Sequence, residues 1–253
     1  MYLRAVHAEG HLPTLRSLVR TQPLGIFTTV IAGSSQFPLL QSTHIPFVLD
    51  VADESSETEL GTLRGHMARA NPHSKAMIEN LSGKSEASQV LENEVMVLFN
   101  GPVHHYVTPK FYTETKPSTG KVVPTWNYAA VEVRGRARVY FDSKSGTAGA
   151  FLDRQVRALT GLCEKGIMGY ERPWSVEDSP ASYVEILKKA IIGIEIEITS
   201  MVGKWKMNQE LSDGDRKGVV GGFEVLGGDA GVCMAQIIQE RAEIAERKKA
   251  EKK

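Results

Sequence analysis

Residues 131–141, VEVRGRARVYF, decide the fold class of this chain. Apolar or small side chains occupy every second position and charged or polar side chains lie between them, which is the period of a strand with one buried face. Residues 191–200, IIGIEIEITS, repeat the pattern, with isoleucines alternating against glutamates. Two long amphipathic strands therefore predict a β-rich protein in which one face of a sheet covers a core.

Shorter apolar runs predict the rest of the secondary structure. Strands are expected at 24–33, 37–50, 61–70, 94–102 and 104–109. Helical spacing, proline positions and helix-forming composition predict helices at 11–23, 71–81, 145–165 and 179–190, and in the tail from Cys233. Six or seven strands with few helices favour a closed or partly closed β-barrel with peripheral helices.

Three details of the remaining sequence also carry predictions. Ser179 and Pro180 are expected to be the cap and the first residue of the helix at 179–190. Residues 110–121, KFYTETKPSTGK, have the composition of a flexible connector that could act as a lid. The glycines of residues 217–231, KGVVGGFEVLGGDAG, match no phosphate-binding loop and are interpreted as caps and turns.

Composition narrows the class of protein. The chain has 253 residues, of which 42% are hydrophobic, and its thirty basic residues balance thirty acidic ones, so no net charge attracts it to nucleic acid or to an anionic membrane. Cys163 and Cys233 are isolated, which indicates a reducing compartment and a cytoplasmic location. No apolar run is long enough to span a membrane. We expect one ligand-binding domain over 1–230 and a charged C-terminal helix over 231–253.

Histidines and basic residues are the first candidates for chemistry. His44 and His66 lack the spacing of a metal site, so we predict no metal and interpret them as anion or flavin contacts or as hydrogen-bonded barrel residues. Arg64, His66 and Arg69 surround Gly65, a cluster that suits a phosphate or else forms surface charges at a strand end.

A second set of candidates lies near the end of the long strand and before its partner. Lys204 and Lys206 share one strand face, where they hold a phosphate or are solvated. Residues 121–128, KVVPTWNY, place Trp126 and Asn127 on opposite sides of a starting strand, so only one of the two is expected to face a pocket. One assignment has Asn127 facing the ligand and Trp126 packed. The alternative is that Trp126 plugs the barrel end and the motif only turns a corner.

Several motifs occur together in the order seen in one family. THIPF, LRGHMARANP, VLFNGP, YVTPKFY, GKVVPTWNY, IIGIEIEI and GKWKMNQ follow one another between residue 1 and about residue 220. In this order the chain resembles the PaiB-like family, the FMN-binding negative transcriptional regulators. VPTWNY is the most specific of these elements.

The resemblance implies a fold, a cofactor and a set of contacts. It implies an FMN-binding split β-barrel of the β-rich α+β class, with peripheral helices and a C-terminal helix, that forms a homodimer with flavin in the groove between subunits. The residues implied as cofactor contacts, together with Arg64 from the phosphate cluster, are His44, Gly65, His66, Arg69, Asn71, Thr125, Trp126, Asn127, Lys204, Lys206 and Gln209.

Two functions remain open for such a protein. One is an enzyme that acts on a small molecule, a flavin-dependent oxidoreductase or a flavin-independent enzyme of the same pocket, with His44, His66 and Asn127 as catalytic candidates. The other is a ligand-responsive transcriptional regulator without catalysis. Direct nucleic-acid binding is not expected from a chain of zero net charge.

Overall fold

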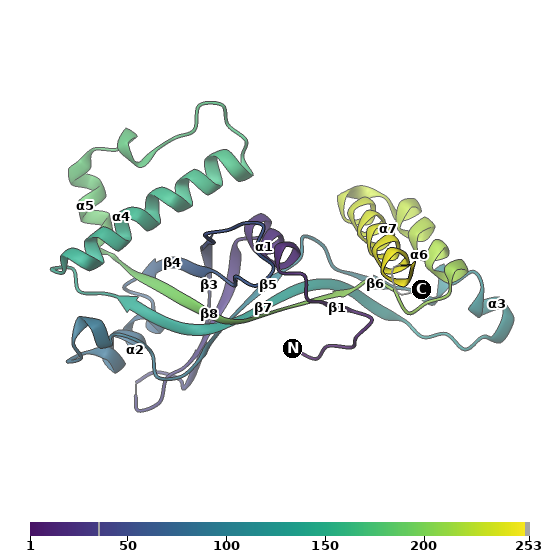
Figure 1. Cartoon of the computed structure of the whole chain (residues 1–253), viewed down its shortest axis with the longest axis horizontal. Helices are drawn as coiled ribbons and strands as arrows, with labels where there is room; N and C mark the ends of the chain where they lie inside the picture. Colours follow the sequence, from purple (N-terminus) through teal and green to yellow (C-terminus); the bar gives the residue numbers. More distant parts are fainter. Residues whose placement is uncertain (35, 251–253) are drawn as a thin grey trace. The chain divides into compact units, whose positions relative to one another are not determined.

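The computed structural model describes residues 1–34 and 36–250, which form two compact units (Figure 1). The barrel unit comprises His11–Phe99 and Glu132–Met201. The helical unit comprises Met1–Gly10, Asn100–Val131 and Val202–Lys253. Each unit is therefore assembled from segments that are far apart in the sequence.

Six strands close into a ring that forms the barrel. They are β2 (Leu24–Val30), β3 (Leu40–Asp50), β4 (Thr62–Ala68), β5 (Val95–Asn100), β7 (Thr125–Tyr140) and β8 (Ile191–Lys206). The hydrogen-bonded order is β8, β4, β3, β2, β5, β7, and a further pairing of β7 with β8 completes the ring. The predicted β-barrel of a β-rich α+β protein is confirmed, and closure leaves no ring strand with an open edge.

Aromatic rings fill the interior of the barrel. Phe27, Phe47 and Phe99 are almost fully buried, and the ring of Phe47 meets the other two edge-on at centroid distances of 6.3 and 6.0 Å. Gly65 of β4 faces Phe47, since a Cβ added at Gly65 would lie 3.0 Å from that ring. A larger residue at position 65 would therefore displace the aromatic core.

Four helices belong to the barrel unit. They are α1 (Leu12–Thr21), α2 (Pro72–Leu81), α4 (Gly146–Gly161) and α5 (Ala181–Lys189), with short helical turns at Glu86–Ser88, Leu162–Ile167 and Val176–Asp178. All four predicted helices of this region are confirmed. The predicted cap at Ser179 is wrong by one position, because Pro180 is the cap of α5, and the turn before it is closed by a reciprocal capping box between Ser175 and Asp178.

The helical unit contains two short strands and a helix pair. The strand β1 (Ala8–Glu9) pairs with Gly203 and Lys204 of β8, and β6 (His105–Val107) pairs with the start of β7. Its helices are the short turn Pro109–Phe111, α3 (Thr115–Thr119), α6 (Asp213–Leu226) and α7 (Gly228–Ala250), of which α6 and α7 pack on each other. No helix within 1–34 and 36–250 is long and apolar enough to cross a membrane.

The prediction of caps and turns in the glycine-rich segment is correct for Gly227, the C-cap of α6, and wrong for the glycines before it. Gly218, Gly221 and Gly222 lie inside α6, and only Gly227 and Gly228 after it have positive φ. A side chain at Gly222 would overlap the ring of Phe111. Glycine is required at position 222 because α6 packs closely against Phe111 of the turn Pro109–Phe111.

The segment 110–121 is a fixed part of the helical unit, so its prediction as a flexible connector is wrong. The carboxylate of Asp215, which is 1% exposed, accepts hydrogen bonds from the backbone N–H groups of Glu114 at 2.8 Å and Thr115 at 3.1 Å. Burial raises the pKa of Asp215, but the bonds from residues 113–115 outweigh it and leave that pKa below its usual value. The carboxylate therefore anchors this segment to the start of α6 as an anion.

Candidate functional site

The residues predicted as cofactor contacts divide between the two units. The barrel unit holds His44, Arg64, Gly65, His66, Arg69 and Asn71, and the helical unit holds Thr125, Trp126, Asn127, Lys204, Lys206 and Gln209. Within the described residues, no three His, Cys, Asp or Glu side chains cluster as a metal site would require. Each group is described within its own unit.

Arg64 is part of a buried ion pair. Its side chain pairs with Asp50 through Nε and through an Nη2 to Oδ1 bond of 2.8 Å, and it donates to Gln155 Oε1 at 3.2 Å. The residue is 3% exposed. These partners occupy the guanidinium, which favours a structural role over a phosphate contact.

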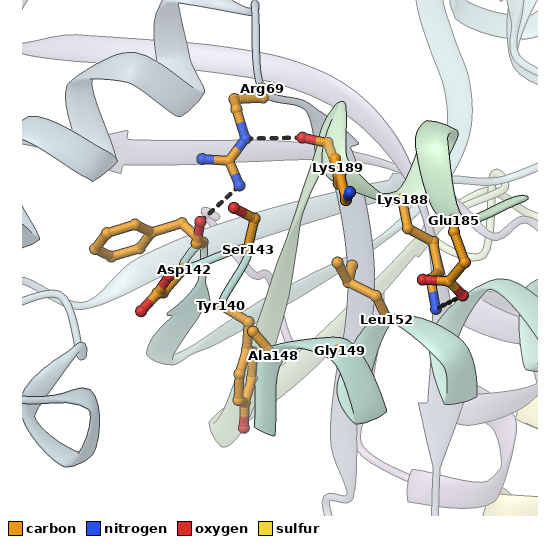
Figure 2. A pocket seen from close by; sticks show the side chains of 11 residues that line it. Arg69, Tyr140, Asp142, Ser143, Ala148, Gly149, Leu152, Glu185, Lys188 and Lys189 are labelled. Carbon is orange, nitrogen blue, oxygen red and sulfur yellow. Dashed lines mark hydrogen bonds and ion pairs between the residues drawn. The ribbon is translucent and has the colours of Figure 1, made fainter. Parts of the chain in front are cut away.

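Arg69 lines a small pocket beside the first turn of α4, and Figure 2 shows how its guanidinium lies. Nε donates to the carbonyl of Lys189 at 3.1 Å and Nη2 to that of Phe141 at 2.6 Å. Lys188 lies in the same pocket, where its ammonium group meets Asp153 at 2.7 Å and Glu185 at 2.5 Å. The pocket has a volume of about 70 Å³, well below the range of small-molecule sites.

Three other predicted contacts of the barrel unit have local roles. Asn71 caps α2 by accepting a bond from the backbone N–H of His73 at 2.9 Å. His44 is exposed and is paired in register with Ile26 of β2. His66 is paired in register with Gly193 of β8. His44 and His66 are therefore not strand partners of each other.

His66 lines an apolar cavity of about 650 Å³. Its Nδ1 is buried and has no hydrogen-bonding partner among the described residues. Burial lowers the pKa of His66, so the neutral imidazole is favoured. Sequence reasoning identified this histidine but missed the apolar residues around it, because they come from α4 and α5 about a hundred residues later.

In the helical unit, the motif at 121–128 surrounds the ammonium group of Lys206. This group donates to Thr125 Oγ1 and, at 2.9 Å, to the carbonyl of Trp126. Burial lowers the pKa of Lys206, while Glu210 opposes that shift. Lys206 is a candidate ligand contact, because its ammonium group is partly desolvated and lies against the motif at 121–128.

Trp126 and Asn127 lie on opposite sides of β7 as predicted, but Trp126 is not packed. Asn127 is fully buried and donates to Asn208 Oδ1, whereas Trp126 is 49% exposed and donates to His104 Nδ1 at 3.2 Å. Asn127 Oδ1 and Asn208 Nδ2 are buried and have no hydrogen-bonding partner within residues 1–34 and 36–250. The alternation of side chains defines the two faces of a strand but does not indicate which face is covered. Here Asn208, 81 positions further along the chain, contacts the face that carries Asn127.

Lys204 and Gln209, two further predicted contacts, form hydrogen bonds to backbone groups of the helical unit. Lys204 Nζ donates to the carbonyl of Tyr2 at 3.1 Å and lies 5.1 Å from the ring centroid of Tyr128. Gln209 Nε2 donates to the carbonyl of Trp205 at 2.6 Å, and its Oε1 accepts from the backbone N–H of Met207 at 2.8 Å. Lys204 is only 7% exposed, so the interpretation of two solvated lysines does not fit it.

We call Thr125, Trp126, Asn127, Lys206 and Asn208 the corner cluster. Thr125 and Asn208 line a pocket of about 220 Å³ that Tyr112, Glu210 and Asp215 also line. Sequence reasoning missed Asn208 as a site residue; its positive φ of 62° is the only signal of a special position, and it is a structural one.

Glu210 is, with Asp215, one of two acidic residues that line this pocket. Its Oε2 lies 2.9 Å from Nε2 of His7. Burial raises the pKa of Glu210, but the bond from His7 and nearby positive charge outweigh it and leave the pKa lowered. Lys206 does not line the pocket, but its cation and the Glu210 carboxylate are close enough for each to shift the pKa of the other.

Comparison with known proteins identifies the family. The family model described as "Putative FMN-binding domain" matches residues 1–200. Uncharacterized protein AN0679 of Emericella nidulans is 58% identical over 253 residues, covering 98% of this chain and 100% of that protein. Protease synthase and sporulation protein PAI 2 of Bacillus subtilis is 25% identical over 194 residues, covering 77% of this chain and 76% of the relative.

Among solved structures, the flavocytochrome Anf3 of Azotobacter vinelandii is similar at a TM-score of 0.46 and 12% identity, covering 81% of this chain and 72% of its own. The family match is the decisive finding. The chain belongs to the FMN-binding domain family whose model spans its first 200 residues. The predicted resemblance to PaiB-like proteins is thereby confirmed.

Proposed function

We propose that the protein binds FMN and that the corner cluster forms part of the site. The observation that carries the proposal is the family match over residues 1–200, which includes the whole 121–128 motif. Bound FMN would supply one- or two-electron redox chemistry to a small molecule. Within the barrel unit, His44, Gly65, Arg69 and Asn71 stay proposed FMN contacts, whereas His66 lines a separate apolar cavity.

The donor set of the corner cluster fits a flavin phosphate or a flavin ring edge. Lys206 offers a cation and Asn208 Nδ2 a buried amide donor that has no acceptor. Asn127 Oδ1 offers a buried acceptor beside them. An amide that stays buried without a partner costs about 1–3 kcal/mol. A ligand that pairs with Asn208 Nδ2 would remove that cost.

A test begins with the visible absorbance of the purified protein and a titration with FMN followed by flavin fluorescence. We expect saturable binding that Lys206→Gln weakens by about ten-fold or more, as loss of one charge-assisted hydrogen bond implies. Lys217→Gln is the matched control, because Lys217 is an exposed residue of α6 outside the corner cluster. Equal FMN affinity of both variants would remove Lys206 from the site, and absence of binding would remove the proposal.

The proposed assembly is a homodimer with the flavin shared between subunits, as the family resemblance implies. Light scattering that gives the mass of one chain in the presence of FMN would contradict it. An obligate interface should bury more than roughly 1,000 Å².

Two uses of the same site are distinguishable. An oxidoreductase would bleach its bound flavin with a reduced nicotinamide or another small reductant and recover the colour with an oxidant. A regulator of the kind that the PaiB-like resemblance implies would change its affinity for a specific DNA when FMN binds. We favour the enzyme, because the net charge of zero provides little attraction to DNA phosphates.

A further inference from the structure

The apolar cavity of the barrel unit lies between α4, α5 and the ends of β4 and β8. Val156 and Leu159 of α4 and Val184 and Leu187 of α5 all line it, and the chain turns back between the two helices (Figure 1). Lys188 of α5 bonds Asp153 of α4 at 2.7 Å and fixes one end of this helix pair. The volume of about 650 Å³ is in the range of small-molecule sites.

The cavity presents aromatic side chains and very few polar ones. Trp174 and Tyr183 line it and are 47% and 54% exposed, although both are side chains that proteins usually cover. Flat rings in an apolar cavity stack favourably on such side chains. A planar aromatic molecule therefore fits the walls better than an aliphatic chain or a sugar.

His66 supplies the polar contact at the β4 side of the cavity. Its imidazole is held by no described residue and its Nδ1 is buried. The other residues of the lining with uncharged polar groups are Thr160, Ser179, Tyr183 and Trp174. A neutral imidazole both donates and accepts a hydrogen bond. The matching ligand is an uncharged ring that carries a hydroxyl or carbonyl group.

The lining argues against FMN as the occupant. Of the six predicted cofactor contacts in the barrel unit, only His66 lines the cavity. Lys188 is the single cation in the lining, and Asp153 and Glu185 already neutralise it. A phosphate would find no free positive partner there, and burying it unpaired is costly.

We propose that this cavity binds a small, neutral aromatic molecule with one hydrogen-bonding substituent, such as a phenol or a quinone, and that His66 is its polar contact. The site is separate from the FMN site proposed above and does not rest on it. Such a molecule is a substrate or an effector of the protein.

Equilibrium dialysis of the purified protein against 2-naphthol and naphthalene tests the proposal. We expect one saturable site per chain and tighter binding of 2-naphthol. Leu159→Glu, which places a charge inside the cavity, should weaken both probes at least ten-fold, as burying a carboxylate against an apolar ring implies. Leu162→Glu, one helical turn on and outside the lining, should leave both affinities within about two-fold of the wild-type values.

His66→Phe keeps the ring and removes the hydrogen bond. It should reduce the preference for 2-naphthol over naphthalene by about five-fold while leaving naphthalene binding nearly unchanged. Three results would overturn the proposal: no saturable binding, equal binding by Leu159→Glu and Leu162→Glu, or displacement of 2-naphthol by FMN. Failure of FMN to bind at all would leave these measurements intact, because the probe assay needs no flavin.

Discussion

His73 is expected to make the barrel unit sensitive to mild acid. It is 2% exposed, its Nε2 lies 2.8 Å from Thr29 Oγ1, its Nδ1 lies 3.0 Å from Thr43 Oγ1, and its ring stacks on Phe27 at 5.1 Å. Both nitrogens are thus engaged by hydroxyl groups that suit a neutral ring. Burial lowers the pKa of His73 to about 4.

The sign of the effect follows from the two states. An unfolded histidine takes up its proton near pH 6.5, whereas folded His73 does so only near pH 4. The stability that the neutral ring contributes is therefore complete above about pH 6.5 and is lost as the pH falls toward 4. At about 1.4 kcal/mol per pH unit, the total loss is about 3 kcal/mol, of which about 2 kcal/mol falls between pH 7.5 and pH 5.

Urea denaturation of the wild type and His73→Gln at pH 7.5 and pH 5 measures this contribution. The variant loses the stacking and is less stable at pH 7.5, but the gap between the two proteins should narrow by about 2 kcal/mol at pH 5. Ser42→Ala, at an exposed position of β3 that carries no titrating group, is the matched control and should keep a constant gap. A gap for His73→Gln that is equal at both pH values, within about 0.5 kcal/mol, would refute the reasoning.

Three further predictions concern the helical unit and are checked by the free energy of unfolding. Gly222→Ala should destabilise by about 1–3 kcal/mol, because its methyl group would overlap an aromatic ring, whereas Gly221→Ala, which meets nothing within 4 Å, should stabilise α6 by about 0.5–1 kcal/mol; equal effects would contradict the packing argument. Asn127→Ala should cost about 1–3 kcal/mol and the half-exposed Trp126→Ala only about 1 kcal/mol, and the reverse order would restore the sequence-based assignment. Asp215→Ala should cost about 2–4 kcal/mol and increase proteolysis within 110–121, and unchanged cleavage would show that other contacts hold that segment.

Periodicity predicted the barrel because burial on one face of a strand is recorded in the strand's own sequence. The alternation over 131–141 and 191–200 reappears as the buried faces of β7 and β8. The interior of α6 was not predictable in this way. Glycine lowers helix propensity, and nothing near Gly222 in sequence reveals that Phe111 needs the space.

The candidate site was predictable only as a set of residue types. The motif at 121–128 and Lys206 were identified, and the structure places them in contact. The partners of Asn127 and Arg64 were not, because Asn208 is 81 positions from the first and Gln155 is 91 from the second. Contacts over such separations depend on the closed topology of the strands and not on local pattern.

The pairing of β1 with β8 constrains the time at which the protein can finish folding during synthesis. Ala8 and Glu9 are synthesised before their strand partners, Lys204 and Gly203. Arg241 of α7 then closes on Glu9 at 2.7 Å. Ala8 and Glu9 must therefore remain without their strand partner until about two hundred more residues have been synthesised. A chain released before that point would expose the unpaired β1 to chaperones and proteases.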